Sequence, residues 1–320
     1  MQFDSTGRLR HLITLEDFPY TALVHLLECA GQIRDAAVGR VDRRGVLHGV
    51  AVCTLFFEPS TRTRSSFELA ARRLGADVLH FDVSTSSTRK GETDLDTLKN
   101  LEAMGIRGFI MRHPDSGAVL RLASQLGQGT TLINAGDGQN AHPTQALQDM
   151  LTLRQAKGNN FSDLKVLIVG DIKHSRVARS NLHALRTLKV KEIRVCGPKE
   201  LLPDDHTMSG CVVDQDLDAM IDGVDVVMML RLQHERIEAG IIGSIDTYVS
   251  NYRLDGARLA RAAKDAIVLH PGPINRGIEI TDAVVDGPQS WVLRQVANGV
   301  AVRMAVLNTL LHRNTHEPLS

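Results

Sequence analysis

Short apolar runs alternate along the chain with segments in which apolar residues recur every three or four positions. In the first half, the apolar runs lie at residues 50–57, 77–83, 108–111 and 130–134. Runs of this length, bounded by polar residues, are typical of buried strands. Residues 64–74, which follow the first run, place Phe67, Ala71 and Leu74 on one helical face. Because strands alternate with helices, the pattern predicts an α/β fold with a parallel sheet covered by helices.

A second series of the same kind begins after the polar stretch at 158–160. Its apolar runs lie at residues 164–169, 193–196, 224–230 and 266–269, and a helical pattern at 176–188 follows the first of them. We therefore expect two domains, residues 1–146 and 147–296, each a parallel sheet flanked by helices. The long amphipathic segment at about 291–312 could pack back on the first domain, and we assign residues 297–320 to that domain. Periodicity alone does not show this contact.

Composition and charge narrow the class of protein. Hydrophobic residues make up 43% of the 320 residues, enough for two buried cores. The 37 basic and 37 acidic residues cancel, so the net charge gives no reason to expect binding to nucleic acid or to a membrane surface. No apolar run is long enough to cross a bilayer, and the first residues lack the apolar core of a signal peptide, so we expect a cytoplasmic protein.

The four cysteines give no sign of metal or thiol chemistry. They form no CxxC pair, and no cysteine–histidine cluster has the spacing of a zinc site. Cys53 and Cys196 lie in apolar, strand-like runs, which favours buried and inert thiols in a reducing compartment. We therefore expect no metal, and a catalytic cysteine has no local support in the sequence.

Hydroxyl and guanidinium groups are concentrated where the first predicted strand gives way to a helix. The residues concerned are Ser60, Thr61, Arg62, Thr63 and Arg64. A helix N-terminus offers unpaired N–H groups and the positive end of a dipole, and the planar fork of arginine fits phosphate oxygens. A helix cap with surface arginines is the alternative. Five consecutive residues of these types at a strand-to-helix turn favour an anion site.

Two further places in the first half carry candidate chemistry. Arg112 follows a strand, where ligands of open α/β sheets gather, although an isolated arginine there is as often structural. The glycine-rich turn at 134–142 leads into a helix with Pro143 at its first position, which puts His142 near the cap. His142 could donate to a carbonyl oxygen that gains charge, or it could cap the helix beside a solvated Gln145. The spacing leaves both interpretations open.

In the second half, arginines follow two of the predicted strands. Residues 170–176 open a helix as a dinucleotide site does, but the glycines of a GxGxxG motif are missing, which disfavours NAD. Arg176 is left at the helix start, and Arg231 follows the run at 224–230 in the same way. Two such arginines suit a substrate with two carboxylates, and a pair of surface arginines is the alternative. The rigid turn at 270–277 could hold a substrate amino group with backbone carbonyls.

Taken in order, these segments resemble the catalytic chains of the aspartate carbamoyltransferase family over nearly the whole chain. The sequence at 60–64 is similar to the family's carbamoyl phosphate signature, which ornithine carbamoyltransferases share, as they share the stretch at 142–145 in outline. Two features separate the sister families. This chain has the Arg-x-Gln-x-Glu-Arg pattern of aspartate enzymes at 231–236, and it reads His-Pro-Gly-Pro at 270–273 where ornithine enzymes have His-Cys-Leu-Pro. Both point to aspartate as the acceptor.

The resemblance implies a role for each matching residue. For carbamoyl phosphate, the residues are Ser60, Thr61, Arg62 and Thr63 at the phosphate, Thr63, Arg112 and His142 at the carbonyl oxygen, and Gln145 at the amide nitrogen. For aspartate, they are Arg176, Arg231, Gln233, Gly272 and Pro273. The implied catalytic set is Arg62, Thr63, Lys90, Arg112, His142 and Gln145.

The resemblance also implies a site shared between subunits. The polar segment 84–92 predicts, by itself, only a surface loop. In the family this loop reaches into the neighbouring subunit of a homotrimer, where Lys90 and Ser86 (or the adjacent Ser87) would enter the site. Glu58 would pair across the domain cleft with Arg176 and Arg236.

The implied reaction uses no cofactor, no metal and no covalent intermediate. The neutral α-amine of L-aspartate attacks the carbamoyl carbon of carbamoyl phosphate, and phosphate leaves with a proton from the amine. The products are N-carbamoyl-L-aspartate and phosphate, in pyrimidine biosynthesis. The homotrimer could join regulatory or dihydroorotase-like chains. The alternatives are a carbamoyltransferase for another amine such as ornithine, a nucleotide-dependent oxidoreductase, and a non-catalytic partner subunit.

Overall fold

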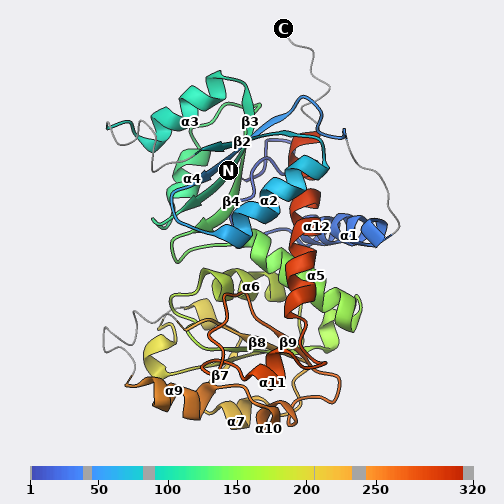
Figure 1. Ribbon diagram of the computed structural model, residues 1–320, viewed down its shortest axis with the longest axis vertical. Helices are drawn as coiled ribbons and strands as arrows, with labels where there is room; N and C mark the ends of the chain where they lie inside the picture. Colours follow the sequence, from blue (N-terminus) through green and yellow to red (C-terminus); the bar gives the residue numbers. More distant parts are fainter. Residues whose placement is uncertain (1, 39–44, 82–90, 205, 233–242, 313–320) are drawn as a thin grey trace. The chain divides into compact units, whose positions relative to one another are not determined.

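The chain folds into two compact units, each built on its own parallel sheet (Figure 1). The computed structural model describes residues 2–38, 45–81, 91–204, 206–232 and 243–312. The first unit comprises Met1–Gln148 and Ala297–Ser320, and the second comprises Asp149–Val296. Among the described residues, no helix has both the length and the hydrophobicity that crossing a membrane requires. The predicted fold class, two parallel sheets flanked by helices, is confirmed.

The first sheet has four parallel strands in the order β2-β1-β3-β4. Their bounds are Ala51–Phe56 for β1, Asp77–Phe81 for β2, Ile106–His113 for β3 and Thr131–Asp137 for β4. The helices are α1 (Tyr20–Val38), α2 (Thr61–Arg73), α3 (Asp94–Ala103), α4 (Ala118–Ala123) and the beginning of α5 (Pro143–Lys157). All four predicted strands of this half are present. The third is longer than its apolar run, so Arg112 lies inside β3 rather than after it.

Both faces of the first sheet are covered by helices (Figure 1). One face buries Cys53, Leu55, Phe109 and Met111 against α3 and α4. The alternation of side chains along a strand turns Val52 to the other face. There a side chain at Gly108 would meet Leu311 and Val52 at 2.9 and 3.2 Å, so the end of the C-terminal helix lies directly against the sheet.

The helices begin where the local sequence provides for their first N–H groups. Thr93 caps α3 with a capping box, in which the Thr93 hydroxyl accepts from the Asp96 N–H (3.1 Å) and Asp96 accepts from the Thr93 N–H (3.3 Å). Ser60 occupies the N-cap position of α2 with extended backbone, and its side chain makes no cap hydrogen bond. The buried face of α2 includes Phe67 and Ala71, as the periodicity predicts.

The C-terminal helix α12 (Val292–Leu311) packs on the first unit from residue 297 onward. Arg303 is only 3% exposed and donates to the Gln148 side chain (3.1 Å), while its guanidinium lies 5.0 Å from the centre of the Phe67 ring. Nearer the N-terminal end of the helix, Asn298 accepts from Arg34 of α1 (3.2 Å). The expectation that this helix packs back on the first domain is confirmed.

The second unit contains five parallel strands in the order β7-β6-β5-β8-β9. Their bounds are Lys165–Val169 for β5, Glu192–Cys196 for β6, Val212–Asp214 for β7, Val226–Met229 for β8 and Ile267–Leu269 for β9. The α-helices are α6 (Arg176–Thr187), α7 (Leu217–Met220), α9 (Ile245–Tyr252), α10 (Gly256–Leu259) and α11 (Asp282–Val285). Single 3-10 turns lie at Phe161–Asp163, Lys199–Leu201 and His206–Met208. The four predicted strands of this half are present, and the added one, β7, is an exposed edge strand.

The packing of α12 gives a stability prediction. Leu311 is fully buried against β3, so Leu311→Ala should lower the free energy of unfolding by about 2–5 kcal/mol, because it removes apolar contacts and leaves a cavity. Leu293 lies on the same helix but is 83% exposed, so Leu293→Ala should change it by less than about 0.5 kcal/mol. Urea denaturation of both variants measures the difference, and equal losses would contradict the packing described.

Candidate active site

In the first unit, the candidate residues lie at the C-terminal ends of the strands, which we call the C-terminal edge of the sheet. The strands β1, β3 and β4 are neighbours, and parallel strands all end on the same side of a sheet. Phe56 pairs with Arg112, and the Phe57 N–H donates to the Arg112 carbonyl (2.9 Å). The predicted residues of this edge are Ser60, Thr61, Arg62, Thr63, Arg112, His142 and Gln145. The structure therefore brings three segments from separate parts of the sequence to one edge of the first sheet.

The N-terminus of α2 has the form of an anion site. Its first turn carries no acidic residue, and the first backbone N–H groups of any helix lack partners inside the helix. Thr61 and Arg62 are exposed, whereas Thr63 is buried. The helix dipole, these N–H groups and the hydroxyls of Ser60 and Thr61 would attract and bind a phosphate without large rearrangement.

Arg112 is held at this edge by an ion pair with Glu58. The guanidinium nitrogen Nη2 contacts Glu58 Oε1, and the two side chains are 11% and 32% exposed. Glu58 lies between β1 and α2, so the ion pair links the end of β3 to the segment that leads into the anion site. The resemblance implied that Glu58 pairs with Arg176 and Arg236. Here it pairs with Arg112 within the first unit. Arg236 lies outside the described residues, and a pairing of Glu58 with residues of the second unit stays a prediction.

His142 is positioned by the turn that follows β4. The buried carboxylate of Asp137 accepts from the Gly117 N–H (2.9 Å) and from the Asn140 side chain (3.0 Å), and the Asp137 N–H donates to the Ala141 carbonyl (3.0 Å). These bonds close the turn and deliver His142 to the start of α5. Sequence reasoning gave Asp137 no role, although a carboxylate inside a glycine-rich turn is a recognisable signal for such a turn.

The environment of His142 and Gln145 bears on the two interpretations left open by the sequence. Their exposed fractions are 4% and 6%, so Gln145 is not a solvated side chain. The His142 carbonyl accepts from the Gln145 N–H (3.0 Å), which ties Gln145, in the first turn of α5, to the residue just before the helix. A buried histidine and a buried amide at a strand end provide oriented donors for a small polar ligand. Their roles at the carbamoyl group stay predictions.

In the second unit, the candidate residues again follow neighbouring strands. Arg176 is the first residue of α6, after β5, and the hydroxyl of its N-cap Ser175 accepts from Ala178 (3.1 Å). Arg231 is exposed and follows β8, where the Leu230 N–H donates to the Val169 carbonyl (2.9 Å). After β9, Gly272 and Pro273 form a turn that contains a cis peptide bond. The arginines and the turn thus lie at one edge of the second sheet.

Four predicted residues lie outside the described part of the chain. They are Ser86 and Lys90, which precede α3 in the sequence, and Gln233 and Arg236, which follow β8. One residue that the sequence patterns did not single out, Glu279, contacts the loops that follow β8 and β9.

Three of the four cysteines have thiols whose pKa is raised. Burial raises the pKa of the Cys53 thiol to about 12, and burial together with nearby carboxylates raises the pKa of Cys196 to about 12. Burial also raises the pKa of Cys211. A thiol in this state carries almost no thiolate at neutral pH, so it neither attacks a substrate nor binds a metal readily. This agrees with the inert thiols predicted from the sequence.

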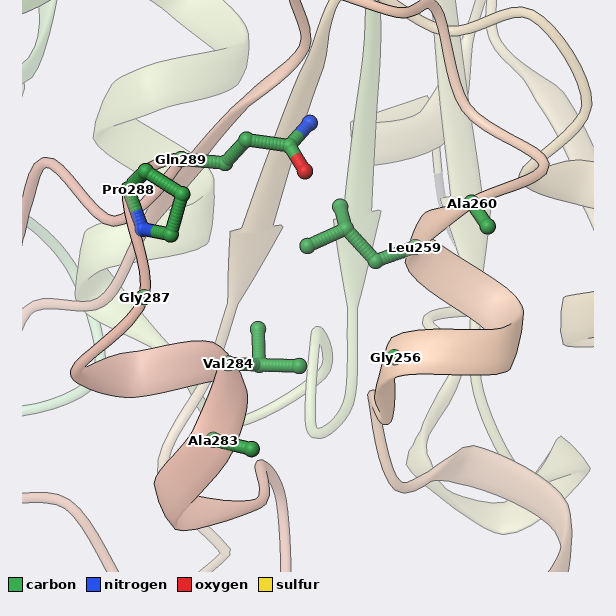
Figure 2. A pocket seen from close by; sticks show the side chains of 8 residues that line it. All are labelled: Gly256, Leu259, Ala260, Ala283, Val284, Gly287, Pro288 and Gln289. Carbon is green, nitrogen blue, oxygen red and sulfur yellow. The ribbon is translucent and has the colours of Figure 1, made fainter.

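A small cavity in the second unit lies away from the candidate residues. It has a volume of about 210 Å³ and is lined mainly by α10, α11 and the segment after α11, with Leu259 and Val284 facing each other across it (Figure 2). Gln289, at its edge, donates to the Ala266 carbonyl (2.9 Å), immediately before β9. The cavity therefore lies near the beginning of β9, whereas Gly272 and Pro273 follow its end.

Comparison with known proteins assigns the chain to a family. Residues 10–155 match the family model described as the carbamoyl-P binding domain of aspartate/ornithine carbamoyltransferases, and residues 162–310 match that of their Asp/Orn binding domain. The chain belongs to the aspartate/ornithine carbamoyltransferase family. The resemblance seen in the sequence is thereby confirmed, and the two matched segments correspond to the two halves that carry the two groups of candidate residues.

Relatives within this family share most of the sequence. The chain is 72% identical over 311 residues to the aspartate carbamoyltransferase catalytic subunit of Stenotrophomonas maltophilia, covering 97% of this chain and 98% of the relative. It is 73% identical to the corresponding subunit of Xanthomonas euvesicatoria, covering 97% and 99%.

Solved structures of the family have the same fold. Aspartate transcarbamoylase from Trypanosoma cruzi, in complex with carbamoyl phosphate and aspartate, is similar with a TM-score of 0.84 at 30% identity, covering 96% of this chain and 98% of the other. Ornithine carbamoyltransferase from Thermus thermophilus is similar with a TM-score of 0.83 at 28% identity, covering 94% and 99%. The fold alone therefore does not separate aspartate from ornithine.

Proposed function

We propose that this chain transfers the carbamoyl group of carbamoyl phosphate to the α-amine of L-aspartate, giving N-carbamoyl-L-aspartate and phosphate, a step of pyrimidine biosynthesis. One observation carries the proposal: 72–73% identity over nearly the full length to aspartate carbamoyltransferase catalytic subunits. The Trypanosoma cruzi neighbour, which binds carbamoyl phosphate and aspartate, supports the substrate pair.

The phosphate of carbamoyl phosphate would bind at the N-terminus of α2. The backbone N–H groups and the hydroxyls of Ser60, Thr61 and Thr63 supply donors, and Arg62 adds a charged fork. During the reaction the phosphate gains negative charge as the bond to the carbamoyl carbon breaks. A site that is already positive before the reaction stabilises that charge without reorganisation.

The carbonyl oxygen of the carbamoyl group would face Thr63, Arg112 and His142. Attack by the amine turns this oxygen into a developing oxyanion, and donors fixed in advance lower the barrier by about 3–4 kcal/mol each in the best-studied cases. The ion pair with Glu58 restricts the Arg112 guanidinium, and burial restricts His142. Gln145 would orient the carbamoyl nitrogen from the same turn.

Aspartate would bind at the edge of the second sheet. Arg176 and Arg231 supply the cations for its two carboxylates, with Gln233 beside them and the backbone of Gly272 and Pro273 near the amine. The amine must be neutral to attack, and it passes its proton to the departing phosphate. Because the whole exchange needs only positioned donors and a basic leaving group, it requires neither a metal nor a covalent intermediate.

Ornithine is the second candidate acceptor, because an ornithine enzyme has the same fold. The sequence favours aspartate at two places. The arginine-rich pattern at 231–236 suits a side-chain carboxylate rather than an ammonium group, and the Pro-Gly-Pro at 271–273 replaces the segment that marks ornithine enzymes.

We further propose that three chains form a ring in which Ser86 and Lys90 of one chain complete the site of the next. A heterologous ring permits this, since each chain both gives and receives a loop. The relatives are called catalytic subunits, which supports assembly with further chains of a regulatory or dihydroorotase-like kind.

Acceptor choice is the direct test of the function. Purified protein supplied with carbamoyl phosphate should carbamoylate L-aspartate far faster than L-ornithine, because the arginines at the second edge favour two carboxylates. Product formation with each amine, followed by chromatography, measures the ratio. Comparable or reversed rates would overturn the assignment to aspartate.

Removing Arg62 and removing Arg231 should weaken the binding of different substrates. Arg62→Ala should weaken the binding of carbamoyl phosphate, and Arg231→Ala should raise the KM for aspartate while carbamoyl phosphate still binds. Each change removes charge-assisted hydrogen bonds worth about 1.5–3 kcal/mol. Calorimetry with carbamoyl phosphate and steady-state kinetics with aspartate separate the two effects. Normal carbamoyl phosphate binding by Arg62→Ala would remove Arg62 from the phosphate site.

Mixed trimers test the shared site. Homotrimers of Arg62→Ala and of Lys90→Ala should each be nearly inactive, whereas trimers reassembled from both variants should recover part of the activity. In every mixed ring, one interface joins a native Arg62 to a native Lys90. If Lys90 served the site of its own chain, each site in a mixed ring would carry a defect, and well-formed hybrids would stay inactive.

A further inference from the structure

Glu279 is a fully buried carboxylate whose oxygens accept three hydrogen bonds. Its exposed fraction is 0%. Oε1 accepts from the Leu232 N–H and from the Asn275 side-chain amide, both at 2.8 Å, and Oε2 accepts from the Asn275 N–H at 2.9 Å. Leu232 is 47 residues away in the sequence, so the carboxylate joins two loops that are distant along the chain.

The two joined loops are those that carry the proposed aspartate residues. Leu232 follows Arg231 directly, in the loop after β8, and Asn275 lies two residues after Pro273, in the turn after β9. Asn275 also donates from its side chain to the Leu232 carbonyl (2.9 Å). Both backbone groups of Leu232 are therefore tied to the turn, the N–H through Glu279 and the carbonyl through Asn275.

The Glu279 carboxylate is buried at a cost that its hydrogen bonds partly offset. Burial raises the pKa of Glu279 from its ordinary value, while the hydrogen bonds from Leu232 and Asn275 act in the opposite direction. Removing a carboxylate from water is unfavourable, but an apolar side chain at the same place would leave the N–H groups of Leu232 and Asn275 without this acceptor. What an apolar side chain lacks is the ability to fix two backbone segments in one relative position.

The backbone of Leu232 sets the direction in which the side chain of Arg231 leaves the loop. An exposed arginine has many rotamers, but the position of its Cα and Cβ atoms determines which of them reach a ligand at the strand ends. The same bonds restrain Asn275, two residues after Pro273, so they also limit the movement of the turn that carries Gly272 and Pro273.

We propose that Glu279 is a positioning residue for the acceptor site. Its carboxylate holds the loop that carries Arg231 and the turn at Gly272 and Pro273 in a fixed relative position, so that the two can bind the carboxylate and the amine of the same acceptor molecule. Asn275 acts with it by completing the tie to Leu232. The proposal rests on the proposed function, because it assigns these loops to aspartate. It extends that function to a residue that touches no substrate.

The test compares aspartate kinetics with two measurements that do not involve aspartate. Glu279→Gln keeps the side-chain volume and one acceptor oxygen but turns the other into a donor that faces the Asn275 N–H. It should raise the KM for aspartate about tenfold (about 1.4 kcal/mol), with kcat at saturation and the Kd for carbamoyl phosphate changed far less. Hydrogen exchange at the Leu232 amide should become faster, because its acceptor is weakened.

Asn275→Ala provides a second variant that leaves the carboxylate in place. It removes the bonds to the Leu232 carbonyl and to Glu279 Oε1, and it should raise the KM for aspartate in the same direction. Asp225→Asn is the matched control. Asp225 accepts from the Lys165 N–H (2.8 Å) at the opposite edge of the same sheet, so this change should lower thermal stability without changing the KM for aspartate.

The outcomes separate the positioning role from the proposed function. If the wild-type protein does not carbamoylate aspartate, the proposed function fails and takes the acceptor-site role with it. If the wild type does, and both variants keep its KM although the Leu232 amide exchanges faster, only the positioning role is overturned. A parallel weakening of carbamoyl phosphate and aspartate binding would reduce Glu279 to a purely structural residue.

Discussion

Neighbouring parallel strands must end on the same edge of a sheet, and both groups of candidate residues depend on that constraint. In the first unit it collects a helix N-terminus, an arginine and a histidine that are separated by tens of residues in the sequence. In the second unit it collects two arginines and a proline-containing turn. The order of the strands decides which loops become neighbours. Local hydrogen bonds and ion pairs then orient the side chains on those loops.

Three of these local interactions are made by carboxylates, which orient other groups and have no proposed part in the reaction itself. Glu58 holds the Arg112 guanidinium, Asp137 closes the turn before His142, and Glu279 joins two loops of the second unit. Each carboxylate accepts hydrogen bonds from groups of its own unit: Glu58 and Asp137 do so in the first unit, and Glu279 does so in the second. The reaction proposed for this chain therefore depends on charged groups that the fold holds in fixed positions.

The sequence predicts most of the architecture because buried strands leave a strong local signal. Apolar runs such as Leu164–Val169 match β5 closely, whereas β7 has no buried residue and gives no such run. The anion site at 60–64 was predictable, since helix start, hydroxyls and arginines are contiguous. The burial of Gln145 was not, because it depends on packing, and Glu279 was not, because its partner Leu232 is 47 residues away and no periodic pattern marks such a pair.

The first and the last described residues belong to the same unit. This arrangement affects the order in which the two units can finish folding. Leu311 packs beside Gly108, and Arg303 packs over Phe67. The core of the first unit therefore stays incompletely packed until α12 has been synthesised and has folded onto it. The second unit, Asp149–Val296, is continuous in sequence and contains its whole sheet. During synthesis the ribosome therefore finishes the inner unit before the outer one. The packing of α12 on the first unit therefore has to follow the synthesis of the second unit, although N-terminal domains usually fold first during synthesis.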